Sequence, residues 1–284
     1  MNPIVEGWYA DPEARYYGGR YYIYVTKSFT DRSGQLNIDA FSSTDLLHWE
    51  KHPDILDMSG YPYVHKAVWA PTVIEKNGQY YLIFASNDIQ NNEERGGLEI
   101  SVSDPFTNHI GRTLVDRFIN YAQPIDAHLF KDDDGVVYLY YGGWEHCNVA
   151  RMNEEMNGFM PFENGEIFKP VTPDNYVEGP CMLKRNGVYH FMWSQGDWIN
   201  GTYHVWASSS TSPVEINPEG RVILESSEIA EGPGHNGYLN ISGTDEWRIV
   251  YHRRIIGDGE AGHRVLCMDK LKFDGDEIVP VVMT

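Results

Sequence analysis

Four segments of the chain repeat one order of polar and apolar positions. Each begins with an acidic or Trp-Ala-Pro motif, continues into a turn that ends in glycine, and closes with a strand rich in aromatic residues. The turns are Gly-Gly, Asn-Gly and Asp-Gly pairs, which supply the positive φ that tight hairpins need. The runs after them are rich in Tyr, Val, Ile and Phe, which favour strands. A β-hairpin is therefore predicted in each segment: residues 9–26, 68–86, 124–143 and 176–195, with a looser fifth copy at 231–254.

The spacing of these hairpins predicts a propeller. The turn glycines recur every 52 to 59 residues, at Gly19, Gly78, Gly135 and Gly187. A period of this kind with β-rich units is typical of a β-propeller, and each unit has room for a third and a fourth strand. Five units fill residues 1–284, and no Pro- or Ser-rich linker divides them. We predict an all-β fold, a single five-bladed β-propeller with a central channel; a β-sandwich is the alternative, but it would not need the repeat.

The charge of the chain restricts its partners. The 22 Lys and Arg residues are outnumbered by 41 Asp and Glu, which gives a net charge of −19. Nucleic acids and anionic membranes attract clustered basic residues, so we expect neither as a partner and favour a neutral one. Three cysteines do not make a disulfide framework. The N-terminal residues lack the basic and apolar regions of a secretion signal, so we expect a cytoplasmic protein, or a secreted one if a signal was removed.

Three of the repeats carry a carboxylate at nearly the same register. Asp11 lies 8 residues before its turn glycine, and Asp126 and Glu178 each lie 9 before theirs. The innermost strands of a propeller run toward one end of the channel, so equivalent positions of different blades converge there. Glycoside hydrolysis needs a carboxylic acid to protonate the leaving oxygen and a carboxylate that activates water or attacks the sugar. A third carboxylate can push their pKa values apart. Glu231, which also precedes Gly-Pro, is a rival for the acid.

At these residues the chain resembles glycoside hydrolase family 43, the five-bladed arabinofuranosidases, xylosidases and arabinanases. The resemblance covers essentially the whole chain and rests on five motifs in order: Gly7-Trp8-Tyr9-Ala10-Asp11-Pro12, Trp69-Ala70-Pro71, Ile125-Asp126-Ala127, Val177-Glu178-Gly179-Pro180 and Gly232-Pro233-Gly234-His235. It implies an inverting hydrolase with Asp11 as general base and Glu178 as general acid. Asp126 would raise the pKa of the acid and orient it. The resemblance favours Glu178 over Glu231.

The resemblance also implies a role for His235 near the channel axis. There it would help to hold a hydrated Ca²⁺, a hard cation whose ligands would be mostly water oxygens. Taken alone, a single His is more often a core residue bonded to the backbone. We therefore expect no required cofactor and a structural calcium ion as a possibility.

Other residues are candidates for contacts with the sugar. Trp69 precedes Ala70-Pro71 at the same channel end, where it would line the pocket or pack between blades. Arg253 and Arg254 end the fifth hairpin, and strand alternation turns one inward; the resemblance favours Arg253 as a donor to a sugar hydroxyl. The family often has an acidic residue where this chain has Thr72. Weaker candidates lie near loop ends: Trp8, Phe29, His65, Asn87, Trp144 and Trp198.

The expected function is an exo-acting, inverting hydrolase of a carbohydrate, on α-L-arabinofuranosyl residues first and β-D-xylosyl residues next. The exo preference rests on the long loops at residues 28–37, 57–66 and 87–97, which could wall off one end of the cleft. A retaining fructosyl hydrolase is a second hypothesis, although its Arg-Asp-Pro acidic motif is not evident. A sugar-binding propeller without catalysis is the third. The glycine-rich run 257–262 is interpreted as a hairpin loop at the cleft edge, because no βαβ unit surrounds it. The oligomeric state is left open.

Overall fold

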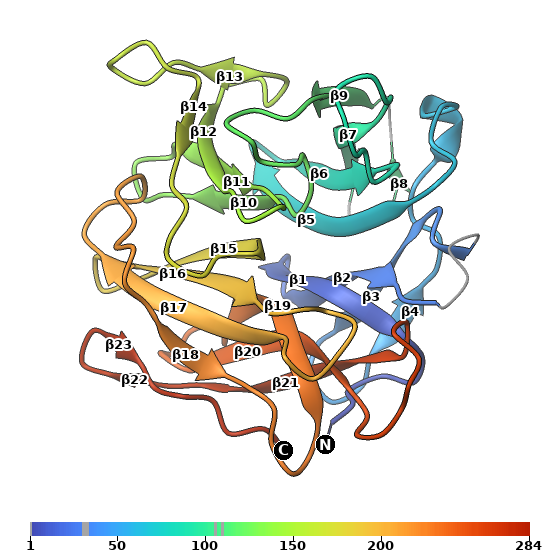
Figure 1. The fold of residues 1–284 in the computed structure, drawn as a ribbon, viewed down its shortest axis with the longest axis vertical. Helices are drawn as coiled ribbons and strands as arrows, with labels where there is room; N and C mark the ends of the chain where they lie inside the picture. Colours follow the sequence, from blue (N-terminus) through green and yellow to red (C-terminus); the bar gives the residue numbers. More distant parts are fainter. Residues whose placement is uncertain (1, 30–33, 105–106, 109–110) are drawn as a thin grey trace.

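The computed structural model describes residues 2–29, 34–104, 107–108 and 111–284. Within them the chain is nearly all β and forms five antiparallel sheets, the blades of a propeller (Figure 1), which confirms the predicted architecture. The innermost strands contact one another in chain order, and the last contacts the first, so the ring of blades is closed. These inner strands are β1 (Tyr9–Tyr17), β5 (Val68–Lys76), β10 (His128–Lys131), β15 (Glu178–Arg185) and β19 (Glu231–Asn240).

The outer strands extend each blade away from the channel, joined to the inner strand by the predicted hairpin. Those of the first two blades are β2 (Arg20–Lys27), β3 (Ile38–Ser43), β4 (Glu50–His52), β6 (Gln79–Ser86), β7 (Gly97–Asp104), β8 (Thr107–Asn108) and β9 (Arg112–Val115). Those of the third are β11 (Val137–Tyr141), β12 (Asn148–Met152), β13 (Phe159–Met160) and β14 (Phe168–Pro170). The fourth and fifth have β16 (Val188–Gln195), β17 (His204–Ser210), β18 (Arg221–Leu224), β20 (Trp247–Arg254) and β21 (Arg264–Leu271).

Both ends of the chain are tied to the last two blades. The Ile4 N–H donates to the Leu266 carbonyl of β21 at 2.9 Å, and the Val281 N–H donates to the Ile223 carbonyl of β18 at 2.7 Å. A small hairpin, β22 (Phe273–Asp274) with β23 (Glu277–Ile278), precedes the C-terminal segment. The two termini therefore lie close together in Figure 1. In the described part of the chain, no helix is long and apolar enough to cross a membrane.

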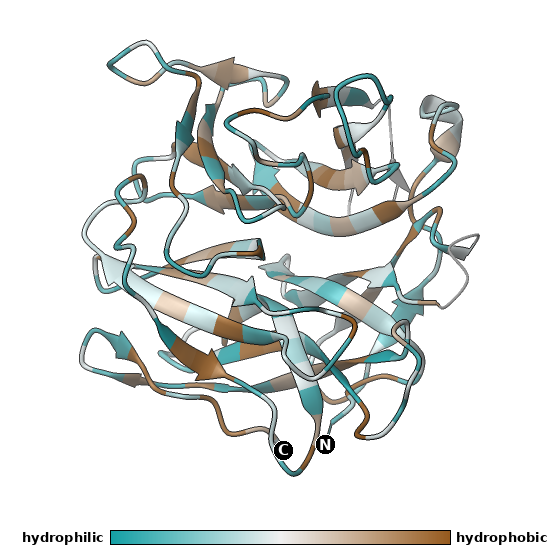
Figure 2. Cartoon of the chain, viewed as in Figure 1, coloured by the Kyte–Doolittle hydropathy of each residue, from teal (hydrophilic) through white to brown (hydrophobic). Residues whose placement is uncertain are grey.

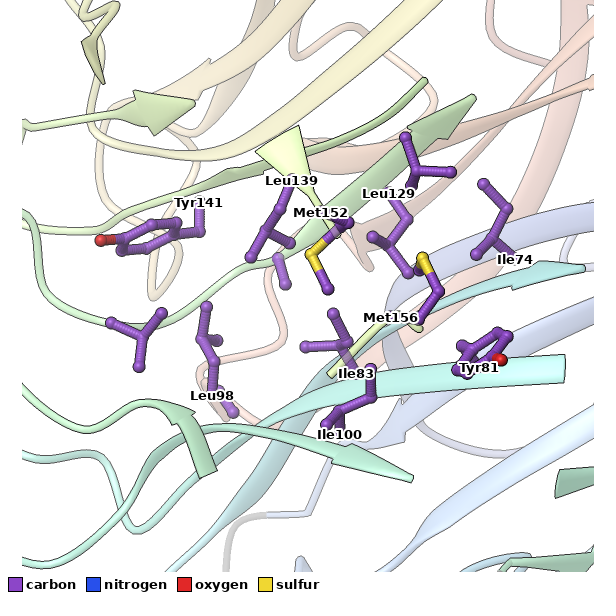
Figure 3. Close-up of a cluster of buried hydrophobic side chains, with 14 of the residues drawn as sticks. Ile74, Tyr81, Ile83, Leu98, Ile100, Leu129, Leu139, Tyr141, Met152 and Met156 are labelled. Atoms are coloured by element: carbon purple, nitrogen blue, oxygen red, sulfur yellow. The ribbon is translucent and has the colours of Figure 1, made fainter. Parts of the chain in front are cut away.

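The blades are held together by apolar side chains that face each other between neighbouring sheets. Figure 3 shows one such cluster, in which Ile83 and Leu98 of the second blade meet Leu139 of the third. All three side chains are fully buried, and each such burial stabilises the fold by about 1.5–3 kcal/mol. Figure 2 shows the apolar residues distributed over all five sheets. Because both faces of a blade pack on a neighbour, strands such as β3 are buried along their whole length.

A β-bulge interrupts the start of four of the five inner strands and places a residue with positive φ at the mouth of the channel. Register shifts lie between Ala10 and Glu13, between Trp69 and Thr72, between Glu178 and Cys181, and between Gly234 and Gly237. The third blade has a residue with positive φ two positions before β10. The five residues are Asp11 (φ 51°), Ala70 (47°), Asp126 (55°), Gly179 (65°) and His235 (41°). Bulges often re-aim side chains next to active sites.

Candidate active site

A pocket of about 520 Å³ opens at the bulge end of the channel and brings the three predicted carboxylates together. Its wall includes parts of loops from all five blades. The residues that line it are Asp11, Phe29, Gln35, Trp69, Asp88, Gln123, Ile125, Asp126, Trp144, Glu178, Trp198, His235, Gly259, Glu260, Ala261, Gly262 and Arg264. The structure thus places seven of the eight predicted site residues in one pocket, and residues 259–262 of the run 257–262 lie at its edge.

The bulge register explains which side chains meet. Asp11, Asp126 and His235 occupy the same position of three blades, and the His235 Nδ1 atom lies 3.4 Å from Asp11 Oδ1 and 3.5 Å from Asp126 Oδ2. Glu178 lies one position earlier in its blade, because Gly179 takes the left-handed position. The carboxylates therefore come from two adjacent positions of the repeat, a refinement of the single register that the glycine spacing predicted.

Asp11 is surrounded by groups that stabilise its ionised form. Burial alone would raise the pKa of this carboxyl, but Arg264, His235 and His252 outweigh it and lower the pKa to about 2. The Arg264 Nη1 atom lies 3.4 Å from Asp11 Oδ1. The Asp11 N–H donates to His252 Nδ1 at 3.2 Å. Asp11 is consequently a carboxylate over the whole physiological pH range.

The pKa values of Glu178 and Asp126 are raised rather than lowered. Burial raises the pKa of Glu178 to about 7, and the Asp11 charge adds to this, while the Tyr203 hydroxyl, which donates to Glu178 Oε1 at 2.8 Å, opposes it. Burial and the negative charges of Glu178 and Asp11 raise the pKa of Asp126 well above its ordinary value. Asp126 Oδ2 accepts the Gly179 N–H at 3.1 Å, so this carboxyl holds the backbone beside Glu178. The pocket therefore keeps an ionised and a protonatable carboxyl side by side near neutral pH.

The structure corrects the predicted arginine. Arg253 is buried away from the pocket and donates to the Thr284 carbonyl at 3.0 Å. Arg254 donates to the carbonyls of Ala261 and Asp258, which fixes the cleft-edge loop. The arginine in the pocket is Arg264, the first residue of β21, which donates to Ser28 Oγ at 2.9 Å. The resemblance favoured Arg253, and strand alternation predicted that one of the two arginines points inward; in fact both Arg253 and Arg254 are buried outside the pocket, and the pocket arginine comes from the start of β21.

The aromatic candidates divide into two groups. Trp69, Phe29, Trp144 and Trp198 line the pocket. The Trp69 indole donates to Gln35 Oε1 at 2.7 Å, which fixes the ring in the wall. Arg264 lies over the Trp198 ring, 4.9 Å from its centroid.

The remaining candidates lie outside the pocket. Trp8 stacks on His263 with ring centroids 4.1 Å apart. Asn87 is buried and bonds the backbone of the loop that carries His65, whose N–H donates to Asn87 Oδ1 at 2.9 Å. Of the three loops behind the exo prediction, 28–37 and 87–97 contribute lining residues and 57–66 contributes none; residues 30–33 of the first lie outside the described residues.

Two residues next to the carboxylates gave no signal in the sequence. Tyr203 is buried, and its ring stacks parallel on His252, with centroids 5.6 Å apart. Gly234 makes room for that ring, since a Cβ at this position would lie 2.1 Å from it. Tyr203, just before β17, and His252, on β20, lie outside the motifs that begin the inner strands, so no predicted motif marks them; Gly234 belongs to the Gly-Pro-Gly-His motif.

Below the pocket the channel is filled by a buried polar layer. Glu13 forms an ion pair with Arg15, accepts the Thr72 hydroxyl at 2.8 Å and lies 3.1 Å from His128 Nδ1. Thr72, which stands where the family often has an acidic residue, is thus a structural partner of Glu13. Arg15 also donates to the backbone carbonyls of two neighbouring blades, at Val73 and Leu129.

The residues around His235 do not form a direct calcium site. Within the described ranges, no group of three or more His, Cys, Asp and Glu side chains is arranged to hold a metal ion. Calcium prefers six to eight oxygen ligands, and the Glu13 carboxylate deeper in the channel is already bonded to Arg15, Thr72 and His128. A calcium ion held through water by His235 stays a prediction, and no step of the chemistry below depends on it.

The sequence of the chain is similar to those of known glycosidases. The chain is 39% identical to a β-D-galactofuranosidase of Aspergillus niger over 100% of its own length and 85% of that protein. It is 26% identical to xylosidase/arabinosidase 43A of Humicola insolens, over 97% of both chains.

Solved structures share the fold. A β-xylosidase/α-arabinofuranosidase from a compost metagenome, in complex with xylotriose, superposes with a TM-score of 0.79 at 22% identity, covering 98% of this chain and 96% of that one. An α-L-arabinofuranosidase of Clostridium thermocellum gives 0.76 at 25% identity, with coverage of 97% and 94%. The model of glycosyl hydrolases family 43 matches residues 1–279. The chain therefore belongs to glycosyl hydrolases family 43.

Proposed function

We propose that this protein is an exo-acting, inverting glycosidase that removes a terminal furanosyl residue, α-L-arabinofuranosyl or β-D-galactofuranosyl, from an oligo- or polysaccharide. The observation that supports this most strongly is the opposite pKa shift of two carboxyls in one pocket. Asp11 is ionised, with its pKa lowered to about 2, whereas the pKa of Glu178 is raised to about 7. Two carboxyls with separate protonation states are what acid–base hydrolysis of a glycoside requires.

In the proposed reaction Asp11 is the general base. Its carboxylate takes a proton from a water molecule, which attacks the anomeric carbon from the face opposite the leaving group. Arg264 and His235 lie beside the carboxylate and position it. The proton that Asp11 gains returns to solvent after the product leaves.

Glu178 is the general acid in this proposal. Tyr203 engages Glu178 Oε1, which leaves Oε2 to give its proton to the glycosidic oxygen as the bond to the anomeric carbon breaks. Asp126 holds the Gly179 amide and so fixes the backbone next to the acid. General acid–base groups of this kind typically accelerate a reaction by about 10²–10⁴-fold each.

The choice of sugar is supported by the relatives and by stereochemistry. A relative at 39% identity is named a β-D-galactofuranosidase, while relatives at 24–28% are named xylosidases or arabinosidases. A β-D-galactofuranosyl residue has the ring of an α-L-arabinofuranosyl residue with one more hydroxymethyl group on its exocyclic chain. One pocket can therefore accept both, and discrimination reduces to contacts with that extra group. A β-D-xylosyl residue, a pyranose, is the second candidate.

The proposal is tested by assaying the purified protein on the 4-nitrophenyl glycosides of these three sugars and following the first product anomer by ¹H NMR. We expect hydrolysis with inversion, fastest on a furanoside. Asp11→Asn and Glu178→Gln should each abolish turnover with the fold intact. First formation of the retained anomer would overturn the inverting mechanism in favour of the fructosyl-hydrolase alternative. Sugar binding without turnover would instead support a non-catalytic propeller.

A further inference from the structure

A second hollow lies beside the active-site pocket and shares a wall with it. The hollow has a volume of about 640 Å³ and is lined by Asn92, Phe118, Asn120, Tyr121, Trp144 and His146. Trp144 lines both the hollow and the pocket that holds the carboxylates. A substrate whose terminal residue occupies the pocket can therefore continue over Trp144 into the hollow without leaving the protein surface.

The hollow presents aromatic rings to solvent. Tyr121 is 79% exposed and Trp144 is 51% exposed, the largest exposures among the Phe, Trp and Tyr side chains of the described residues. Each ring packs against another ring of the hollow. The ring centroids of Trp144 and Phe118 lie 4.8 Å apart, and those of Tyr121 and His146 lie 5.5 Å apart. Grouped exposed rings of this kind mark ligand-binding surfaces, because water solvates their faces poorly.

The backbone under these rings is strained. Asn120, Tyr121, Trp144 and Glu145 all have positive φ, between 50° and 66°. This conformation is rare for large side chains and costs of order 1 kcal/mol or more each, so it persists only where surrounding contacts impose it.

Hydrogen bonds supply those contacts. The Asn148 side-chain amide donates to the Ile119 carbonyl at 2.8 Å, and the Asn120 amide donates to Asn148 Oδ1 at 2.8 Å. The His146 ring bonds the Trp144 carbonyl at 2.7 Å. The fold thus maintains two strained turns, one that carries Tyr121 and one that carries Trp144, and both side chains line the hollow.

The chemistry of the lining selects a neutral ligand. None of the residues that line the hollow is Asp, Glu, Lys or Arg. The polar side chains of the hollow include the Asn92 and Asn120 amides beside the Tyr121 hydroxyl and the His146 imidazole. Asn92 uses Oδ1 to accept the Phe118 N–H at 2.7 Å, which leaves its NH₂ group to donate to a ligand. Flat apolar faces combined with amide donors match a sugar ring, whose C–H face stacks on an aromatic ring while its hydroxyls bond at the edge.

We infer that this hollow is the binding subsite for the first sugar of the leaving group, with Tyr121 and Trp144 as its stacking platform. This inference rests on the proposed exo-hydrolase, since in an exo enzyme everything beyond the cleaved residue belongs to the leaving group. It assigns the protein a saccharide rather than a small alkyl or aryl glycoside as its substrate. The binding free energy of the leaving sugar then contributes to kcat/KM.

The test compares two substrates that share the cleaved residue. One is the methyl furanoside, and the other carries the same furanosyl residue on a trisaccharide. For Tyr121→Ala we expect the ratio of kcat/KM, trisaccharide over methyl glycoside, to fall by about 10-fold, mostly through KM. Tyr121→Phe should keep the ratio, because the ring face rather than the hydroxyl makes the contact. Tyr16→Ala is the matched control, since Tyr16 is an exposed tyrosine (39%) at the opposite end of the channel, and it should leave the ratio unchanged.

The outcomes separate this inference from the proposed function. If the wild type hydrolyses both substrates and Tyr121→Ala leaves their ratio unchanged, the subsite is refuted while the hydrolase stands. If the wild type hydrolyses neither, the proposed function itself is refuted and the subsite falls with it. A release of disaccharides from the non-reducing end would place the hollow on the other side of the scissile bond and so also overturn the inference.

Discussion

Two neighbouring blades begin their inner strands with the same three residues, Glu-Gly-Pro, and use them differently. In β15 the bulge follows Glu178 directly, so its carboxyl lies in the pocket. In β19 the strand has two bulges, and the one that matches the other blades lies after Gly234. Glu231 is thereby displaced three residues from the equivalent position. It lies against Gly201 and does not line the pocket.

This difference teaches that register, rather than the motif, decides which glutamate reaches the site. Gly234 pairs with His252 as Glu178 pairs with Ser194. The position equivalent to the acid is therefore a glycine in the fifth blade, and its small size admits the Tyr203 ring that bonds Glu178. The pKa shift of Glu178 follows from burial at this position.

The largest expected effect separates the two glutamates. Glu178→Gln should lower kcat on a glycoside with a poor leaving group by about 10³-fold or more, because it removes the carboxyl that we propose as the proton donor to the leaving oxygen. Glu231→Gln should change kcat by less than twofold. Thermal unfolding of both variants serves as the control for folding. Equal losses of kcat in Glu178→Gln and Glu231→Gln would contradict the different roles assigned to the two glutamates.

A smaller expected effect separates two arginines, Arg264 and Arg253. Arg264→Met removes the permanent positive charge beside Asp11, so we expect kcat/KM to fall by about 10- to 100-fold. The pKa of Asp11 should rise, which moves the acidic limb of the pH–rate profile to higher pH. Arg253→Met, on the same sheet, should leave that limb in place. A limb that moves in Arg253→Met but not in Arg264→Met would contradict the assignment.

The smallest expected effect is a shift in the alkaline limb of the pH profile of kcat/KM. Glu178 must be protonated to act, so kcat/KM should fall as the pH rises through its pKa of about 7. Tyr203 donates to Glu178 and lowers that pKa, so Tyr203→Phe should move the alkaline limb upward by about 0.5–1 pH unit. The measurement is kcat/KM between pH 5 and 9. A downward shift would show that Tyr203 does not stabilise the ionised acid.

The repeat and the carboxylates could be predicted from the sequence because they are local. Turn glycines, aromatic strands and the motifs around Asp11, Asp126 and Glu178 lie within short segments, and a propeller turns a sequence period into a circle. The sequence also marks three of the residues with positive φ, because Pro12, Pro71 and Pro180 each directly follow one of them.

The supporting residues could not be predicted. Arg264, His252 and Tyr203 meet Asp11 and Glu178 only through pairing between strands and blades. None of them lies in a motif that begins an inner strand, although His252 is part of the fifth hairpin, 231–254. The choice of Arg253, which rested on the resemblance, was wrong because Arg253 and Arg254 are both buried outside the pocket and the pocket arginine comes from β21. The candidate carboxylates could be identified from the sequence, but the groups that surround them depend on tertiary structure.

The most direct test of the account is the leaving-group dependence of Glu178→Gln. We would measure kcat/KM for wild type and variant on aryl furanosides whose phenols span several pKa units. The account predicts a loss of about 10³-fold with a poorly acidic phenol that shrinks toward no loss with 2,4-dinitrophenol, which departs without protonation. A loss of the same size for every phenol would contradict the role of Glu178 as the acid.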